Sequence, residues 1–336
     1  MKPQIKIRAE FHWELKDYFL TNLLSKTHNL KRVKTNPDIT IGVVEPIPLT
    51  EEFKNSPIKI LVAGENINYK INIFKALEYL TKKTSIKFNI LNKILPRKFL
   101  NIKLGLIRKQ YYDYIKKIAK DSPKGEYAII TNNLKGKNIL NLPFFLQVKQ
   151  ITDNLNKLEK KKIININKKK KFCCIIISNE SSFERIDFFK QLSKYKKVDC
   201  FGKTSLTNSN NSLLPKCWTE NPKFLSQYKF VISFENSFEE DYITEKLLNT
   251  MLANSIPIYR GAPNISKYFN TDSFINYENC DKDYGKMIEK IIQLDSDNEK
   301  YKKFIKKDWM TRKNKQRVIN KVLELDNFLN NIMSNK

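Results

Sequence analysis

The sequence predicts an α/β protein with two Rossmann-like domains, and three observations support that prediction. The chain has 336 residues, which is enough for about two domains that each bury a core. Short β-branched runs alternate with helical stretches, a pattern typical of parallel sheets covered by helices. The eight glycines form no G-x-G-x-x-G motif, so a dinucleotide-binding fingerprint is absent. We therefore predict two such halves that face a cleft.

The N-terminal domain is expected over residues 1–160. Its predicted strands are short apolar runs bounded by Pro, Gly or Asn, as buried strands should be. From about residue 67 to residue 121 the chain becomes basic and takes on helix-like apolar spacing. The expected strands are Lys6–Glu10, Asp38–Val44, Ile58–Ala63, Tyr127–Thr131 and Leu140–Phe145, and a helix is expected at Asp17–Ser25.

The C-terminal domain is expected over residues 161–310, and it shows the clearest strand–helix alternation. A continuous apolar run at Phe172–Ser178 is typical of a strand that is buried on both faces. A capping box at Ser181–Glu184 predicts a helix that ends at about Tyr195. Residues 311–336 are expected to form a basic helical tail. Further strands are expected at Val198–Phe201, Lys229–Phe234 and Ile256–Tyr259, with a helix at Tyr242–Ala253.

The composition limits the chemistry that the chain can perform. It has 62 Lys and Arg against 35 Asp and Glu, a net charge of +27, so nucleic acid, an anionic membrane or an acidic small molecule are candidate partners. The lysines are spread along the chain, which favours a general Lys enrichment over a nucleic-acid-binding module. Only two histidines occur, and the five cysteines form no C-x-x-C pair, which argues against zinc clusters and Ser-His-Asp catalysis.

No targeting or membrane signal is evident. The chain has no apolar run near the ~18 residues that a membrane span requires. Its first thirteen residues are too charged for a secretory signal peptide. We expect a cytoplasmic protein that could contact a membrane from one side, with the aromatic and basic segment Lys300–Lys336 as the contact. For this tail we favour a helix that returns to the N-terminal domain over membrane contact.

The stretch Phe230–Gly261 carries the most chemical information. A buried strand ends in Phe234-Glu235-Asn236, an acidic loop follows, and a helix begins near Tyr242-Ile243-Thr244-Glu245-Lys246. This order puts Glu245 and Lys246 in a first helical turn, where backbone N–H groups favour an anion. A lysine there can hold phosphate, and a carboxylate can accept ribose hydroxyls. An ordinary charge pair on an amphipathic helix is the alternative interpretation.

These residues resemble the donor-binding signature of the inverting α-1,3/4-fucosyltransferases, which use GDP-fucose and have the two-domain GT-B fold. The similarity combines the Phe-Glu-Asn tripeptide, the Tyr-x-Thr-Glu-Lys helix start and the Pro-Ile-Tyr strand at fixed spacing. It extends from about Phe172 to Tyr277. The resemblance implies that Arg185 and Lys246 contact the GDP phosphates and that Glu245 binds the ribose. Asn236 and Tyr242 would line the same pocket.

The N-terminal half carries a weaker part of the same resemblance. Gly64-Glu65-Asn66 is similar to the family tripeptide whose glutamate is the proposed general base, so Glu65 is the expected base. Later landmarks of the family's acceptor domain follow only after about sixty residues, so residues 67–121 are interpreted as a basic helical insertion. Arginines expected between Tyr127 and Pro143 are absent, which leaves the acceptor side undefined.

The resemblance implies transfer of L-fucose from GDP-fucose, with inversion, to a glycan hydroxyl, most simply an α-1,3 linkage to N-acetylglucosamine or glucose. No metal or other cofactor is expected, because cationic side chains occupy the phosphate positions. The aspartate pairs at 281/283 and 295/297 are therefore not expected to bind metal. Two alternatives stay open: a glycosyltransferase that uses another nucleotide sugar, and a non-catalytic basic binding protein derived from one.

Overall fold

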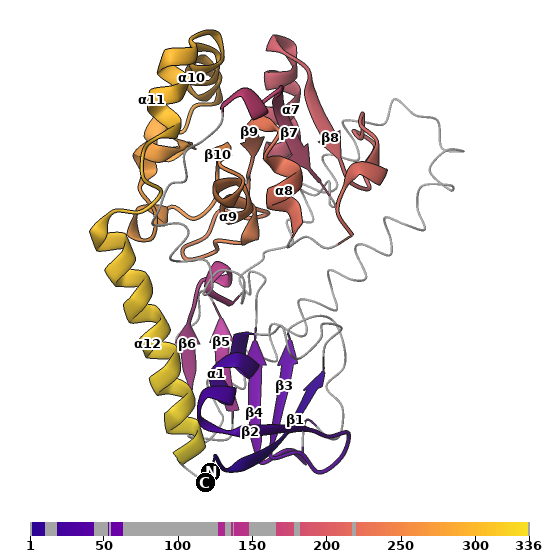
Figure 1. The fold of residues 1–336 in the computed structure, drawn as a ribbon, viewed down its shortest axis with the longest axis vertical. Coiled ribbons are helices and arrows are strands. Elements are labelled where there is room, and N and C mark those ends of the chain that lie inside the picture. Colours follow the sequence, from indigo (N-terminus) through magenta and orange to yellow (C-terminus); the bar gives the residue numbers. More distant parts are fainter. Residues whose placement is uncertain are drawn as a thin grey trace. The chain divides into compact units, whose positions relative to one another are not determined.

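The computed structural model describes residues 2–10, 19–43, 53, 55–62, 127–131, 136, 138–147, 166–177, 182–216 and 220–334. The expected base Glu65 and the segment 67–121 lie outside these residues. Two compact units are present (Figure 1). The first unit comprises Met1–Asn141 and Phe328–Lys336, and the second comprises Leu142–Asn327. Among the described helices, none combines the length and the apolar character needed to cross a bilayer.

The first unit is built on a six-stranded sheet in the order β2-β1-β3-β4-β5-β6. All of its strand pairs are parallel. Every residue of β4 is buried, as expected for a β-branched strand at the centre of a parallel sheet. The elements are β1 (Gln4–Glu10), α1 (Phe19–Thr27), β2 (Asn29–Arg32), β3 (Ile39–Val43), β4 (Ile58–Val62), β5 (Tyr127–Thr131) and β6 (Ile139–Asn141).

The second unit has a five-stranded parallel sheet in the order β11-β10-β9-β7-β8. Its strands are β7 (Lys171–Ile176), β8 (Val198–Phe201), β9 (Tyr228–Ile232), β10 (Ile256–Tyr259) and β11 (Ile275–Asn276). Its α-helices are α7 (Phe183–Tyr195), α8 (Asn221–Leu225), α9 (Glu245–Leu252), α10 (Tyr284–Ser296), α11 (Asn298–Ile305) and α12 (Arg312–Ser334), which continues into the first unit. Short 3₁₀ turns lie at Phe144–Gln147, Ile166–Lys168, Asn211–Leu213, Ile265–Lys267, Thr271–Ser273 and Glu278–Cys280.

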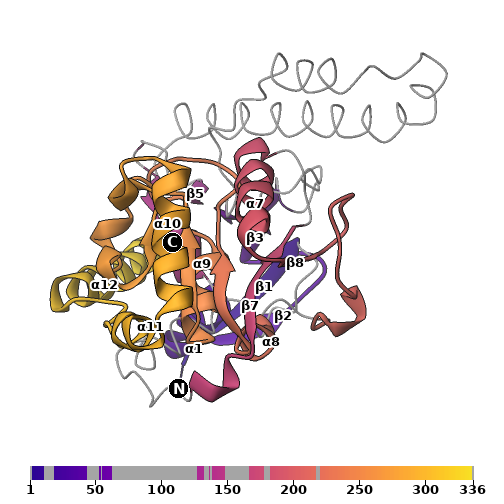
Figure 2. The same ribbon diagram turned by 90° about the horizontal axis from the view of Figure 1, so that it is seen from above.

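Helices cover both faces of the second sheet. On one face, strand residues such as Ile175 and Ile258 pack against three helices. These helices contribute Phe188 from α7, Ile291 from α10 and Ile305 from α11. The helices α10 and α11 lie side by side (Figures 1 and 2). On the opposite face, Cys174 and Tyr228 pack against Leu225 at the end of α8 and Ala253 directly after α9. The sheet is therefore doubly wound.

The boundary between the units lies at Asn141, earlier than the residue 160 expected from the sequence. The reason is that the segment after β6 packs within the second unit. Phe145 N–H donates to Ile243 O over 2.9 Å. The Phe145 ring also lies 5.7 Å from that of Tyr268 and 5.1 Å from that of Phe269.

The strand order places a ligand site. Numbered along the chain, the strands of the second sheet run 2-1-3-4-5, so the order reverses between β7 and β9. In doubly wound sheets, ligands bind outside the carboxyl ends of the strands at such a reversal. The loops that follow β7 and β9 are therefore the expected location of a site in this unit.

Candidate functional site

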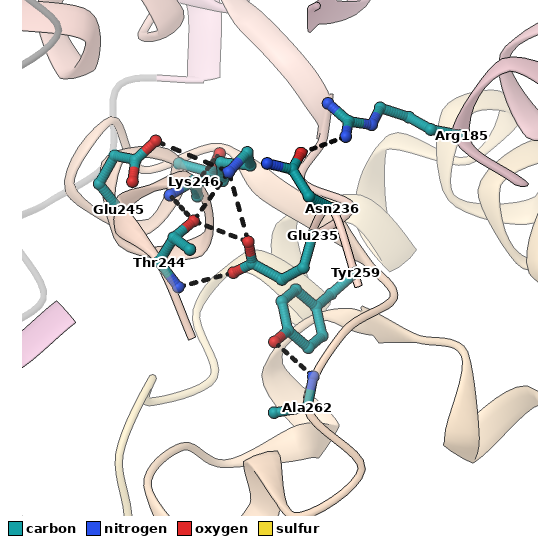
Figure 3. A network of polar contacts seen from close by, with 9 residues as sticks. Arg185, Glu235, Asn236, Thr244, Glu245, Lys246, Tyr259 and Ala262 are labelled. Carbon is teal, nitrogen blue, oxygen red and sulfur yellow. Dashed lines mark hydrogen bonds and ion pairs between the residues drawn. The ribbon is translucent and has the colours of Figure 1, made fainter. Parts of the chain in front are cut away.

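Arg185 and Asn236 meet across the reversal of strand order. Arg185 lies in the first turn of α7, which follows β7, and Asn236 follows β9. A hydrogen bond from Arg185 Nη2 to Asn236 Oδ1 joins them (Figure 3). Sequence similarity alone predicted that these two residues share a pocket, and the structure brings them together.

The Arg185 guanidinium is almost completely enclosed, with 3% of the residue exposed. Burial lowers its pKa, and Glu235 is the strongest of the neighbouring groups that oppose this shift. Its Nε–H is buried and has no hydrogen-bond partner among the residues that the structure describes. Because an arginine stays charged in proteins, the site contains a desolvated cation with unused donor capacity.

Glu235 is a buried carboxylate that organises the site, with only 1% of the residue exposed. Its two oxygens accept hydrogen bonds from Thr244 N–H and Thr244 Oγ1, each over 2.7 Å. Lys246 Nζ lies 3.4 Å from Glu235 Oε2 (Figure 3). Burial raises the pKa of the Glu235 carboxyl, and the Lys246 ammonium works against that shift. Glu235 therefore ties the end of β9 to the start of α9.

The helix α9 begins three residues later than the expected start at Tyr242. Thr244 has an extended backbone and is the N-cap, and its hydroxyl accepts the Lys246 N–H over 3.4 Å. Glu245 and Lys246 consequently occupy the first turn, as predicted. Acidic and hydroxyl groups at this end satisfy N–H groups that the helix itself leaves free.

Lys246 is held from several sides yet stays accessible. Its ammonium donates to Thr244 Oγ1 over 3.0 Å and lies 3.8 Å from Glu245 Oε1. The side chains of Lys246 and Glu245 are 24% and 25% exposed. A cation and an acceptor therefore stand at the surface of a helix start, next to the enclosed guanidinium of Arg185.

Tyr242 lies near the same side chains. It is fully buried and lies within electrostatic range of Arg185. The loop that leads to it is fixed by Asp241, whose backbone adopts a positive φ of 57°. Asp241 Oδ1 accepts hydrogen bonds from Tyr268 Oη and from Asn264 Nδ2, each over 2.9 Å. These contacts hold the acidic loop between β9 and α9 in one conformation.

The loop after β10 passes very close to Glu235. A Cβ atom on Gly261 would lie 2.4 Å from Tyr259 Oη and 2.5 Å from Glu235 Cγ. The Tyr259 hydroxyl in turn accepts the Ala262 N–H over 3.0 Å (Figure 3). Glycine is required here for close approach, since any side chain would displace the buried carboxylate.

Sequence reasoning missed two of the organising side chains. Glu235 and Thr244 lie within the Phe-Glu-Asn and Tyr-x-Thr-Glu-Lys motifs, but the sequence predicted no role for either side chain. The available signal was a carboxylate that directly follows a buried strand, because such a position demands a hydrogen-bonded partner. Among the residues that the structure describes, no three His, Cys, Asp or Glu side chains gather as a metal site would need.

A family model describes the same region of the chain. The model of the C-terminal part of glycosyltransferase family 10 (fucosyltransferase) matches residues 166–328. Residues 166–328 are thus similar to the C-terminal part of this fucosyltransferase family. The match contains all of the site residues described above.

Curated relatives carry fucosyltransferase names. A putative fucosyltransferase of Acanthamoeba polyphaga mimivirus is 36% identical over 147 residues, which is 42% of this chain and 24% of that protein. The 4-galactosyl-N-acetylglucosaminide 3-alpha-L-fucosyltransferase 9 of Mus musculus is 31% identical over 144 residues, 41% of this chain and 37% of the enzyme. The similarity thus spans between about a quarter and two fifths of these relatives.

Solved structures of fucosyltransferases share the fold over nearly the whole chain. A crystal structure of an alpha1,3-fucosyltransferase with GDP-fucose superposes with a TM-score of 0.59 and 17% identity, and covers 97% of this chain and 91% of that one. A second structure of an alpha1,3-fucosyltransferase has a TM-score of 0.59 and 18% identity. The fold of this chain is therefore GT-B, an α/β fold with two parallel sheets.

Proposed function

We propose that the chain is an α-1,3-fucosyltransferase that moves L-fucose from GDP-fucose, with inversion, to a hydroxyl of a glycan acceptor. N-acetylglucosamine or glucose is the proposed acceptor residue. The family match over residues 166–328 supports the proposal, as do relatives that are named fucosyltransferases. So does the fold, which is that of an alpha1,3-fucosyltransferase crystallised with GDP-fucose.

The observation that carries the proposal is the pair of cations at the carboxyl edge of the second sheet. Arg185 is joined to Asn236, and Lys246 stands at the start of α9. An arginine can bind phosphate through two parallel N–H bonds, whereas a lysine acts as a point charge. In our proposal these two cations hold the diphosphate, Glu245 binds the ribose hydroxyls, and Tyr242 lines the pocket.

The proposed reaction is a single displacement. The acceptor hydroxyl oxygen forms a bond to the anomeric carbon of fucose while the bond from that carbon to the phosphate oxygen breaks. The proton of the hydroxyl passes to Glu65, which the family resemblance assigns as the base, and GDP leaves with the electron pair. Arg185 and Lys246 would stabilise the charge that develops on the leaving phosphate. Since these cations supply that stabilisation, we propose that no metal is required.

We also propose where the protein acts and what it contacts. The chain would work in the cytoplasm, with its basic C-terminal helix able to rest on an anionic membrane that presents lipid-linked glycans. Its excess of Lys and Arg, spread along the sequence, would serve this attraction and not nucleic-acid binding.

Calorimetric titration tests the donor assignment. GDP-fucose, GDP and GDP-mannose would be titrated into the wild type, Lys246→Ala and Lys31→Ala, an exposed lysine of β2 that serves as the control for charge loss. We expect GDP-fucose to bind and Lys246→Ala to weaken it by about 10- to 100-fold, with Lys31→Ala unchanged. Tighter binding of GDP-mannose would instead favour another GDP-sugar as donor. If no GDP species binds the wild type, a non-catalytic basic protein replaces this proposal.

A further inference from the structure

Arg260 is a second guanidinium beside the site, at the carboxyl end of β10. Its carbonyl accepts the Glu235 N–H over 2.8 Å, so its backbone adjoins the buried carboxylate. Its guanidinium carbon lies 5.4 Å from the ring centre of Phe238 and 5.4 Å from that of Tyr277. Two aromatic rings therefore orient the guanidinium, and contacts of this kind restrict it without using its N–H donors.

The hydrogen-bonding capacity of Arg260 is largely unused. Its Nε–H is buried, and no group in the described part of the chain accepts a hydrogen bond from it. Its Nη2 lies 3.7 Å from Glu184 Oε1, beyond hydrogen-bond distance, and the Glu184 side chain is 39% exposed. Buried donors in native proteins are almost always satisfied, so a buried Nε–H without a protein partner is available to a ligand. The Arg185 Nε–H, one residue along α7 from Glu184, is unsatisfied in the same way.

The charges of the site indicate which ligand would suit Arg260. The cations Arg185 and Lys246 are balanced by the carboxylates Glu235 and Glu245, which lie close to them. A diphosphate adds negative charge on each of its phosphate groups, which this balanced set does not neutralise. A further cation next to the site would do so, and Arg260 is only loosely paired with Glu184.

We propose that Arg260 is a third cation of the donor site and binds the diphosphate of the nucleotide sugar. The Nε–H and one Nη–H of a guanidinium lie on one edge and match two oxygens of a phosphate. The aromatic rings of Phe238 and Tyr277 hold the plane of the guanidinium, and the diphosphate replaces the distant Glu184 as its partner. This inference rests on the proposed function and adds a residue to that site.

Titration of the full chain with GDP and guanosine tests the inference. The variants are Arg260→Met, Arg260→Lys, Glu184→Gln and a control, Lys307→Met, whose ammonium lies 4.9 Å from the ring centre of Phe304 in α11. We expect Arg260→Met to weaken the binding of GDP by about 10- to 100-fold and to leave the affinity for guanosine unchanged. The GDP affinity of Arg260→Lys should lie between those of the wild type and Arg260→Met, because lysine keeps the charge and loses the bidentate geometry. Lys307→Met should match the wild type.

Glu184→Gln separates binding from a purely structural role. If Arg260 binds the diphosphate, removing its competing carboxylate should leave GDP affinity unchanged or increase it. If Arg260 only holds α7 in place through Glu184, then Glu184→Gln should weaken GDP binding as much as Arg260→Met does. That result would overturn the inference. Wild-type affinity for GDP in Arg260→Met would also overturn it. Should Arg260→Met fail to fold, Arg260→Lys decides in the same way. A wild type that binds no GDP rejects the proposed function instead.

Discussion

The two ends of the five-stranded sheet each hold a buried carboxylate beside lysines, and the two arrangements differ. At the amino end of β9, Asp295 accepts from Lys229 Nζ over 2.8 Å and from Lys196 Nζ over 2.9 Å. At the carboxyl end, Lys246 Nζ lies 3.4 Å from Glu235 Oε2 and is closer, at 3.0 Å, to the hydroxyl of Thr244. One carboxylate is fully engaged by its lysines, and the other shares its lysine with other groups.

The pKa values follow this difference. Burial favours the neutral acid at Asp295, but hydrogen bonds from Lys229 and Lys196 outweigh it, so its pKa lies below the usual value. At Glu235 burial prevails over the attraction of Lys246, and the pKa is raised. An ion pair that is saturated stabilises packing alone. The Lys246 ammonium is instead shared among Glu235, Glu245 and Thr244, and its side chain is 24% exposed, so a ligand can reach it.

Removal of the Glu235 carboxylate should have the largest effect on stability. Glu235→Ala leaves the Thr244 N–H and the Lys246 ammonium without their buried acceptor, so we expect the free energy of unfolding to fall by about 3–5 kcal/mol. Urea denaturation followed by circular dichroism measures it. The exposed Glu240→Ala in the neighbouring loop is the control and should stay within about 0.5 kcal/mol. A loss below about 1 kcal/mol at Glu235 would contradict its organising role.

Replacing the lysine at each end should separate stability from binding. Lys229→Met and Lys246→Met each leave a buried carboxylate with fewer donors, and we expect each to lower the free energy of unfolding by about 1–3 kcal/mol. Only Lys246→Met should also weaken the binding of GDP, by about tenfold or more. Calorimetry and urea denaturation on the same preparations give both quantities. Equal loss of GDP affinity in the two variants would remove the distinction between the two ends.

The smallest effect is expected in the acid range. Because the folded pKa of Asp295 is depressed, the unfolded chain binds more protons there, so its stabilisation is present above about pH 4 and is lost as the pH falls through the folded pKa. Asp295→Asn should therefore be less stable than the wild type by about 1–2 kcal/mol at pH 7, and the gap should narrow below pH ~4. The exposed Asp272→Asn is the control. A gap that is constant with pH would show that folding does not lower the pKa of Asp295.

Much of the fold was predictable from the sequence because the strands are buried on both faces. The expected strand Ile58–Ala63 matches β4 at Ile58–Val62, and Phe172–Ser178 matches β7 at Lys171–Ile176. The strand β2 was missed. Its residues Asn29–Arg32 are largely exposed, so no apolar run marks it, and only pairing with β1 makes it a strand.

The candidate site was partly predictable for a different reason. Arg185, Asn236 and Lys246 lie close together because their motifs follow neighbouring strands of one parallel sheet. Glu235 and Arg260 were not singled out, since their importance lies in burial and in unpaired donors, which spacing does not reveal. The role of Glu65 as base stays a prediction.

The path of the chain through the two units has a consequence for synthesis on the ribosome. The second unit is one continuous segment, Leu142–Asn327, whereas the first unit contains Met1–Asn141 together with the end of α12. The six strands of the first unit are thus made first, but its last piece emerges only after the whole second unit. At about 5–20 residues per second this delay is on the order of ten seconds or more. A nascent chain therefore has all of its second unit before it can complete its first.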